Sequence, residues 1–233
     1  MVILCGGRGT RLQEHTQSIP KPIVEIGGRP ILWHVIQIYL AQRFRRFLLL
    51  TGYMGRQVEQ FIASQAWPES TDIRCLATGE DTPTGGRLRL AAQLLDRRRF
   101  CATYADGVAD IDLDALLDCH AGHGAHATMT VVRPELPFGV AQCGRDGVVR
   151  GFIEKPRSEQ WINGGFFCFE PVVLDLLGSD SVLEREPLEA LAATGQLRAF
   201  FHDGFWDCLD TYKDAVVLND LWGAGSAPWK LWS

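Results

Sequence analysis

The chain has 233 residues, of which 46% are hydrophobic and 22% charged, and its formal net charge is -5. This length fits one large α/β domain, or two small ones, with a full-sized core. Nucleic-acid-binding surfaces carry clustered positive charge, so the negative balance argues against such a partner. No apolar run approaches the roughly 20 residues needed to cross a membrane, and the N-terminus enters a strand without the regions of a signal peptide.

Cysteine usage indicates the compartment. The seven cysteines are odd in number and include no C-x-x-C pair. Cys5, Cys101, Cys143 and Cys168 fall in apolar runs of strand type, where a thiol behaves as a small hydrophobe. This pattern favours a reducing cytoplasm without disulfides, and the spacings do not favour a structural zinc site.

The chain begins with a short apolar strand, Val2–Cys5, which runs into a glycine-rich loop. Glycine lets the backbone turn sharply and approach a ligand, while a threonine hydroxyl and a planar arginine suit phosphate oxygens. The loop therefore predicts a nucleoside triphosphate site, with an ordinary tight turn as the alternative. Its spacing matches neither the dinucleotide fingerprint nor a Walker loop. The residues concerned are Gly6, Gly7, Gly9, Thr10 and Arg11.

Lys21 lies between two prolines, which keep Ser18–Pro22 extended and allow the lysine to return to the glycine loop. A solvated loop lysine is the alternative. Beyond it, apolar runs alternate with amphipathic segments, and this alternation indicates a mostly parallel sheet with helices on both faces. We expect helices over about 30–42 and 56–65, and strands over 47–50, 73–77 and 100–104.

A second glycine-rich loop spans Thr78 to Arg87 and leads into a helix that reaches about Leu95. It can approach a ligand, although an ordinary surface loop would look similar. Asp106 follows the strand over 100–104, where open α/β sheets bind ligands, and we interpret it as a metal ligand rather than a cap. Asp110 and Asp112 are better placed to cap the helix over 113–123.

Three histidines, His120, His123 and His126, invite comparison with a metal site. The first two share a helix face, but the third lies past Gly124 and no carboxylate partner is evident. The pattern favours a polar helix end over metal ligands.

From Ala127 the pattern becomes rich in strands, which we expect over 127–133, 139–143, 148–153 and 162–169. These strands are expected to extend the sheet and to form the acceptor side of a cleft. Lys155 follows one of them and is either a ligand for a substrate phosphate or a loop lysine. Asn163 precedes paired glycines, and such a pair inside a strand usually marks a bulge or a close ligand.

The last part should contain a helix after Pro171, a helix over 184–194 and a strand over 197–201. The segment 207–211 is expected to open the final helix, with Thr211 and Asp214 resembling a capping box. Asp210 precedes this cap and is not needed for it, so its carboxylate remains available to bind a metal. Three tryptophans near the C-terminus indicate either a packed cover or a subunit contact, and the sequence does not decide between them.

These features together resemble the sugar-1-phosphate nucleotidyltransferases, and more closely their glucose-1-phosphate cytidylyltransferase branch. The resemblance covers nearly the whole chain. The matching segments are C-G-G-R-G-T-R-L, P-K-P-I-V-E-I-G-G-R-P-I-L-W-H, T-G-G-R-L, Y-A-D-G-V-A-D, E-K-P, I-N-G-G-F-F, G-F-W-D-C-L-D-T and A-P-W-K-L-W.

The resemblance implies a single domain over 1–233 with a Rossmann-like, mostly parallel sheet and flanking helices. About 1–126 would bind the nucleotide, and the β-rich part over about 127–233 would bind the sugar phosphate. It assigns Arg11 and Lys21 to catalysis, and Asp106 and Asp210 to a shared Mg²⁺. Nucleotide-binding residues would be Leu4, Gly6, Gly7, Gly9, Thr10, Arg11, Lys21 and Arg87. Sugar-phosphate-binding residues would be Lys155, Asn163 and Gly164.

The implied reaction is attack of a sugar-1-phosphate oxygen on the α-phosphorus of CTP, with pyrophosphate leaving. Positioning and charge neutralisation carry such a reaction between two anions. The alternatives within the enzyme class are a uridylyl- or thymidylyltransferase, or an enzyme that uses another sugar phosphate with CTP. Outside it they are a protein that binds nucleotides without turnover and, more distantly, a dinucleotide oxidoreductase. Five charged residues that turnover needs are present and favour the enzyme: Arg11, Lys21, Asp106, Lys155 and Asp210.

Two departures from the family pattern affect these expectations. Ala105 stands where the motif Y-G-D-G has its first glycine, so we expect its methyl group to crowd the close approach of a ligand. The segment between Gln57 and Thr78 is shorter than the branch leads us to expect. We therefore expect a cytoplasmic homo-oligomer that is a dimer rather than a hexamer.

Overall fold

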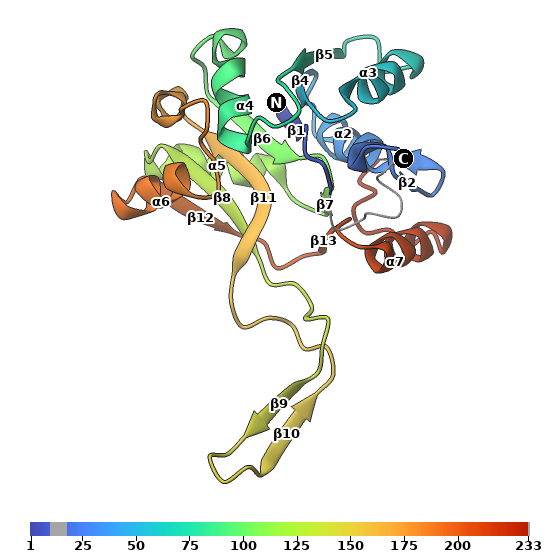
Figure 1. Cartoon of the computed structure of the whole chain (residues 1–233), viewed down its shortest axis with the longest axis vertical. Coiled ribbons are helices and arrows are strands. Elements are labelled where there is room, and N and C mark those ends of the chain that lie inside the picture. The colour runs from blue at the N-terminus through green and yellow to red at the C-terminus, as the bar shows by residue number, and fades with distance from the viewer. Residues whose placement is uncertain (10–17, 233) are drawn as a thin grey trace.

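The computed structural model describes residues 1–9 and 18–232. Its centre is a seven-stranded sheet with the order β12-β8-β11-β6-β1-β4-β5 (Figure 1). Among these described strands only β11 runs antiparallel to its neighbours, so the prediction of an α/β fold with a mostly parallel sheet is confirmed. The strands are β1 (Val2–Cys5), β4 (Arg46–Thr51), β5 (Asp72–Ala77), β6 (Phe100–Tyr104), β8 (Ala127–Val132), β11 (Ile162–Phe169) and β12 (Leu197–Phe201).

The sheet is covered on both faces, which explains its nearly continuous apolar strands. Along β1, side chains alternate between the two faces: Ile3 and Cys5 join one core cluster, and Val2 and Leu4 join the other. Helices of the first cluster are α2 (Ile31–Ala41), α3 (Gly55–Ser64), α5 (Leu113–His123) and α7 (Tyr212–Gly223). Helices of the second cluster are α4 (Thr84–Ala91) and α6 (Glu186–Ala193).

Helix starts follow the expected caps. The Asp112 side chain accepts a 2.9 Å bond from the Ala115 N–H at the start of α5. Thr211 and Asp214 form the predicted capping box of α7. Among residues 1–9 and 18–232, three short 3-10 segments connect the larger elements: η2 (Lys21–Ile23), η3 (Ala92–Leu95) and η4 (Pro171–Leu176). The helix expected after Pro171 is thus a 3-10 segment.

The expectation that every strand after Ala127 extends the sheet is wrong for two of them. β9 (Val140–Cys143) and β10 (Val149–Ile153) pair only with each other among the described strands and form a hairpin arm that projects from the body (Figure 1). All four residues of β9 are exposed, so this strand has no buried face with which to join a covered sheet.

The segment 207–211 does not open the last helix as expected. Trp206–Cys208 forms β13, which pairs antiparallel with β7 (Gly107–Ala109). Ladder hydrogen bonds to β7 therefore take this backbone, and α7 begins only at Tyr212. A second small pair consists of β2 (Glu25–Ile26) and β3 (Arg29–Pro30).

The C-terminal tryptophans form a packed cover over α2. Trp229 is fully buried, and Trp222 and Trp232 make edge contacts with Trp33.

In helix α5, His120 and His123 each lie 2.7 Å from the Thr128 hydroxyl, which matches the polar helix end favoured above. Within residues 1–9 and 18–232, none of the helices has the length and apolar character needed to span a membrane.

Candidate active site

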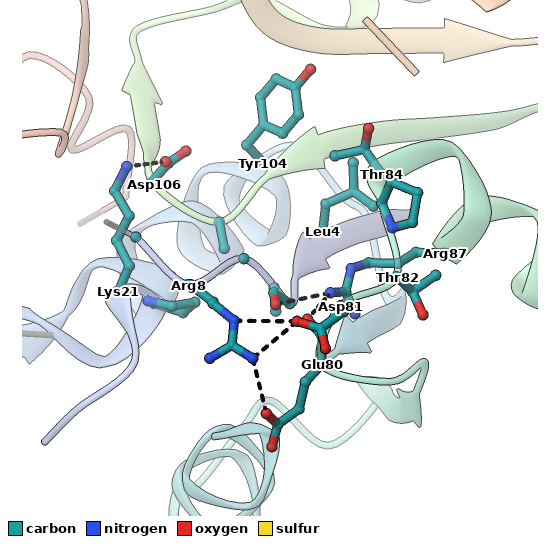
Figure 2. A pocket seen from close by; sticks show the side chains of 17 residues that line it. Leu4, Arg8, Lys21, Glu80, Asp81, Thr82, Thr84, Arg87, Tyr104 and Asp106 are labelled. Carbon is teal, nitrogen blue, oxygen red and sulfur yellow. Dashed lines mark hydrogen bonds and ion pairs between the residues drawn. The ribbon is translucent and has the colours of Figure 1, made fainter. Parts of the chain in front are cut away.

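A cavity of about 430 Å³ opens at the carboxyl ends of β1 and β6 (Figure 2). Its wall contains all of the described residues that the sequence assigned to the nucleotide. Leu4 lies on β1, and the glycine loop follows this strand. The second glycine-rich loop leads into α4, and Asp106 lies between β6 and β7. The lining residues used below are Leu4, Gly6, Gly7, Arg8, Gly9, Lys21, Glu80, Asp81, Thr84, Arg87, Tyr104, Ala105 and Asp106.

Lys21 joins the two carboxylates that the sequence assigned to a metal. Its Nζ lies 2.6 Å from Asp106 Oδ2 and 2.7 Å from Asp210 Oδ1. Burial opposes the charge of this lysine, but the two carboxylates outweigh burial and raise its pKa. The three residues come from different parts of the chain, and a bond of 2.9 Å from the Leu209 N–H to the Asp106 carbonyl oxygen sets Asp210 beside Asp106.

Asp106 and Asp210 therefore lie close enough to hold one ion. No group of three or more histidine, cysteine, aspartate or glutamate side chains within residues 1–9 and 18–232 is arranged to hold a metal. Mg²⁺ usually takes one or two carboxylates together with substrate phosphates, so two converging carboxylates fit that pattern. In this structure they hold the Lys21 ammonium instead.

Arg87 lines the cavity, but it mainly holds the two glycine-rich loops together. The side chain is 3% exposed, and its guanidinium donates to the carbonyl oxygens of Gly6 at 2.9 Å and Gly79 at 2.8 Å. Burial lowers its pKa. A Cβ on residue 6 would lie 2.1 Å from Arg87 Cζ, which explains why a glycine is needed there.

Arg8 is a site residue that the sequence analysis missed. Its guanidinium pairs with Asp81 at 2.9 Å and with Glu80 at 3.4 Å, as the dashed lines in Figure 2 show. The hydrogen bond to Asp81, followed by the charge of the same carboxylate, raises the pKa of Arg8. Its position between Gly7 and Gly9 was the available signal, since a cation there must lie near the loop's ligand.

Tyr104 is a second residue that the sequence analysis missed. Its hydroxyl donates to the Glu184 carboxylate and accepts a 3.4 Å bond from Asn163 Nδ2. Burial is the main cause that raises the pKa of Tyr104. The Thr84 hydroxyl also donates to Glu184, at 2.6 Å, so a polar network connects Asn163 with the cavity wall.

The paired glycines after Asn163 mark a bulge, as their place inside a strand indicated. The β8–β11 register shifts between Asn163 and Phe167. Gly165 has a φ of +79°, and a Cβ on it would lie 2.6 Å from Tyr104 Cδ2. The Gly164 carbonyl oxygen accepts a 2.7 Å bond from Trp206 Nε1, so the bulge also supports the segment that leads to Asp210.

The remaining predicted residues lie elsewhere or outside the described residues. Lys155 is exposed just after β10, at the base of the hairpin arm, and it is not part of the cavity wall. Thr10 and Arg11 lie outside the residues that the structure describes. Ala105 is 3% exposed, contributes to the core and borders the cavity, so its methyl group lies at the junction of both.

Comparisons with known proteins show the family of the chain. The family described as nucleotidyl transferase matches residues 1–207. The chain is 42% identical to the glucose-1-phosphate cytidylyltransferase of Salmonella typhimurium over 99% of this chain and 98% of that one. It is 40% identical to the probable glucose-1-phosphate cytidylyltransferase of Bacillus subtilis, over 99% of each chain. The Salmonella alignment extends over 254 positions, so that relative carries residues that this chain of 233 lacks.

Solved structures share the fold at lower sequence identity. The crystal structure of HddC from Yersinia pseudotuberculosis superimposes with a TM-score of 0.74 at 22% identity, covering 95% of this chain and 98% of that one. A putative glucose-1-phosphate thymidylyltransferase from Bacillus anthracis gives a TM-score of 0.73 at 19% identity, covering 97% of this chain and 94% of that one. These likenesses support the architecture.

Proposed function

Because the chain belongs to the nucleotidyl transferase family, we propose that it transfers the cytidylyl group of CTP to glucose-1-phosphate. The products are CDP-glucose and pyrophosphate. The observation that carries this proposal is the 42% identity to a glucose-1-phosphate cytidylyltransferase, which extends over 99% of the chain. The cavity supports it, because the glycine loop, Lys21 and Asp106 lie at its wall and Asp210 lies beside them.

The reaction needs two anions to meet, so charge neutralisation and positioning are the main requirements. We propose that the backbone N–H groups of the glycine loop and the side chains of Lys21 and Arg11 hold the triphosphate. Lys21 is protonated and already lies at the cavity wall. Asn163, Gly164 and Lys155 are proposed to face the acceptor phosphate, with Tyr104 orienting Asn163.

Members of this family generally use a divalent metal, and we propose Mg²⁺ held by Asp106 and Asp210. Both carboxylates reach the same Lys21 nitrogen, which supports a shared ion. When bound, Mg²⁺ would supply positive charge to the triphosphate. Lys21 would then be free to bond phosphate oxygens in place of the carboxylates.

We propose that residues 1–233 act as one domain, with nucleotide-binding residues mostly in 1–126 and acceptor-binding residues mostly in 127–233. Strands of both parts share one sheet, which supports this division of labour within a single body. We further propose a cytoplasmic homo-oligomer, with a dimer favoured over a hexamer. The exposed aromatic side chains of the arm, Phe138 at 75% and Phe152 at 64%, support self-association.

A pyrophosphate-release screen of the common nucleoside triphosphates against a panel of sugar-1-phosphates tests the reaction. We expect CTP with glucose-1-phosphate to give the highest kcat/KM, and turnover to require a divalent cation. Faster turnover with UTP or dTTP would change the assigned base. Nucleotide binding without pyrophosphate release from any pair would contradict the assignment as a transferase.

A further inference from the structure

Arg8 links the two glycine-rich loops across the cavity that would receive the nucleotide. Its Nη2 lies 2.9 Å from Asp81 Oδ1 and 3.4 Å from Glu80 Oε2, and its Nε lies 3.3 Å from Asp81 Oδ1. The guanidinium also lies 5.0 Å from the ring centre of Tyr53. All three charged side chains line the cavity, so the link belongs to its wall (Figure 2).

Among the described residues that line the cavity, the cations are Arg8, Lys21 and Arg87, and each already has partners in the protein. A triphosphate can therefore gain one of these side chains only in exchange for a present partner. Arg87 is 3% exposed and holds loop carbonyl oxygens, so its release would leave buried groups unsatisfied. Lys21 is 13% exposed and bonds two carboxylates.

Arg8 is the cation that is easiest to exchange. Its side chain is 47% exposed, and the side chains of its partners Glu80 and Asp81 are 61% and 85% exposed. Ion pairs between exposed side chains contribute little to stability, because water screens them and two long side chains must be ordered. A triphosphate offers several charged oxygens, and arginine is well suited to bind them in pairs.

The negative charges of Glu80 and Asp81, called the acidic pair below, also oppose binding of the proposed ligand. Glu80 and Asp81 place two negative charges at the wall of a cavity that would bind a highly negative nucleotide. While Arg8 pairs with these carboxylates, they neutralise its positive charge, and its guanidinium is less available to phosphate. Glu80 and Asp81 therefore compete with the ligand for Arg8.

We propose that Arg8 leaves Asp81 and Glu80 when the nucleotide binds, and that its guanidinium then forms ion pairs with the triphosphate. Arg8 is then a binding residue for the triphosphate, and Glu80 and Asp81 set how readily it is released. This inference rests on the proposed function, since it takes a nucleoside triphosphate as the ligand. The contact between Arg8 and a phosphate group is additional to the contacts that the family resemblance implies.

A double-mutant cycle on CTP binding tests the exchange. The dissociation constant for CTP is measured by calorimetry without sugar phosphate, for wild type, R8L, the pair E80Q/D81N, and the three changes combined. We expect R8L to weaken binding roughly tenfold, because a charge-assisted contact is lost. We expect E80Q/D81N to tighten binding roughly two- to fivefold, but only when Arg8 is present.

The cycle separates exchange from simple repulsion. If the acidic pair only repels the nucleotide, its removal tightens binding equally with Arg8 and with R8L, and the proposal is overturned. If the ion pairs only support the loops, R8L and E80Q/D81N both weaken binding, which also overturns it. R43L and D114N remove another exposed ion pair, between Arg43 and Asp114, and should leave CTP affinity and melting temperature unchanged.

Failure of the inference can be told from failure of the function. A wild-type protein that binds no CTP and releases no pyrophosphate overturns both. A wild-type protein that binds and turns over CTP, with an R8L variant of equal affinity, overturns the inference alone. Thermal melting of each variant confirms that the compared proteins are folded.

Discussion

Lys21 Nζ lies 2.6 Å from Asp106 Oδ2, so the cation proposed to bind the triphosphate forms an ion pair with a carboxylate proposed to bind the metal. Asp210 approaches the same nitrogen at 2.7 Å. These two ion pairs hold Lys21, Asp106 and Asp210 together, so substitution of any one of the three charges should have a measurable effect.

We expect Asp106→Asn to lower kcat about 100-fold or more, because a charged group in the proposed site is lost. We also expect the free energy of unfolding without ligand to fall by about 1–2 kcal/mol, because partly buried Lys21 loses a charged partner. Urea unfolding and steady-state kinetics measure the two effects. Asp118→Asn on the exposed side of α5 is the control, and near-normal turnover of Asp106→Asn would refute the assigned role.

Gly6→Ala should destabilise the protein, because a Cβ on residue 6 would lie 2.1 Å from Arg87 Cζ. The guanidinium cannot move without giving up its bonds to loop carbonyl oxygens, so we expect a loss of about 1–3 kcal/mol. Gly7→Ala is a matched control, since a Cβ there would meet no atom of the described residues within 4 Å and should change stability by about 0.5 kcal/mol at most. Equal unfolding midpoints of the two variants would show that Arg87 is free to move.

Acid should weaken the fold through His34. This side chain is completely buried, with Nε2 2.9 Å from the Ile26 carbonyl oxygen and Nδ1 accepting a 3.3 Å bond from Trp229 Nε1. Burial lowers its pKa from 6.5 to about 4. A histidine with a lowered pKa in the folded state stabilises the fold fully above pH 6.5, and this contribution is lost as the pH falls towards 4.

The whole effect of His34 amounts to roughly 3 kcal/mol, since one pKa unit corresponds to about 1.4 kcal/mol. It is measured as the difference in unfolding free energy between wild type and His34→Gln, followed from pH 7 to pH 4.5. The difference should shrink or reverse on acidification. A difference that stays constant over this range would mean that His34 titrates as it does in the unfolded chain. The pKa values of His120 and His123 are also lowered by burial, so only the comparison with the variant isolates His34.

Tyr104→Phe should weaken acceptor binding while leaving CTP affinity unchanged. The phenol oxygen bonds both Asn163 and Glu184, and its removal leaves Asn163 without this support. We expect the KM for the sugar-1-phosphate to rise about threefold to tenfold. Asn163→Ala should have a larger effect, and the double variant should add little to it, since both act through one contact. A matching loss of CTP affinity in calorimetry would place Tyr104 in the nucleotide site instead.

Local patterns were sufficient for much of the fold and for part of the site. The continuous apolar run of β1 and the alternation of strands and helices predicted the covered parallel sheet, because burial on both faces demands such runs. The caps at Asp112 and Thr211 were predictable since they depend on residues three positions away. The common position of the glycine loop and Asp106 at one cavity was predictable, because the carboxyl end of a buried strand is a local feature.

Contacts between distant segments were decided only by the tertiary structure. The pairing of β13 with β7 sets Asp210 beside Asp106 and Lys21, and no pattern within 207–211 indicates that pairing. The separation of the arm from the sheet depends on which strand meets β8, and β11 takes that place. Arg8 bonds Asp81 across 73 residues, and Arg87 reaches Gly6 across 81. Local propensity and periodicity describe neighbours along the chain, whereas these bonds depend on how the layers pack.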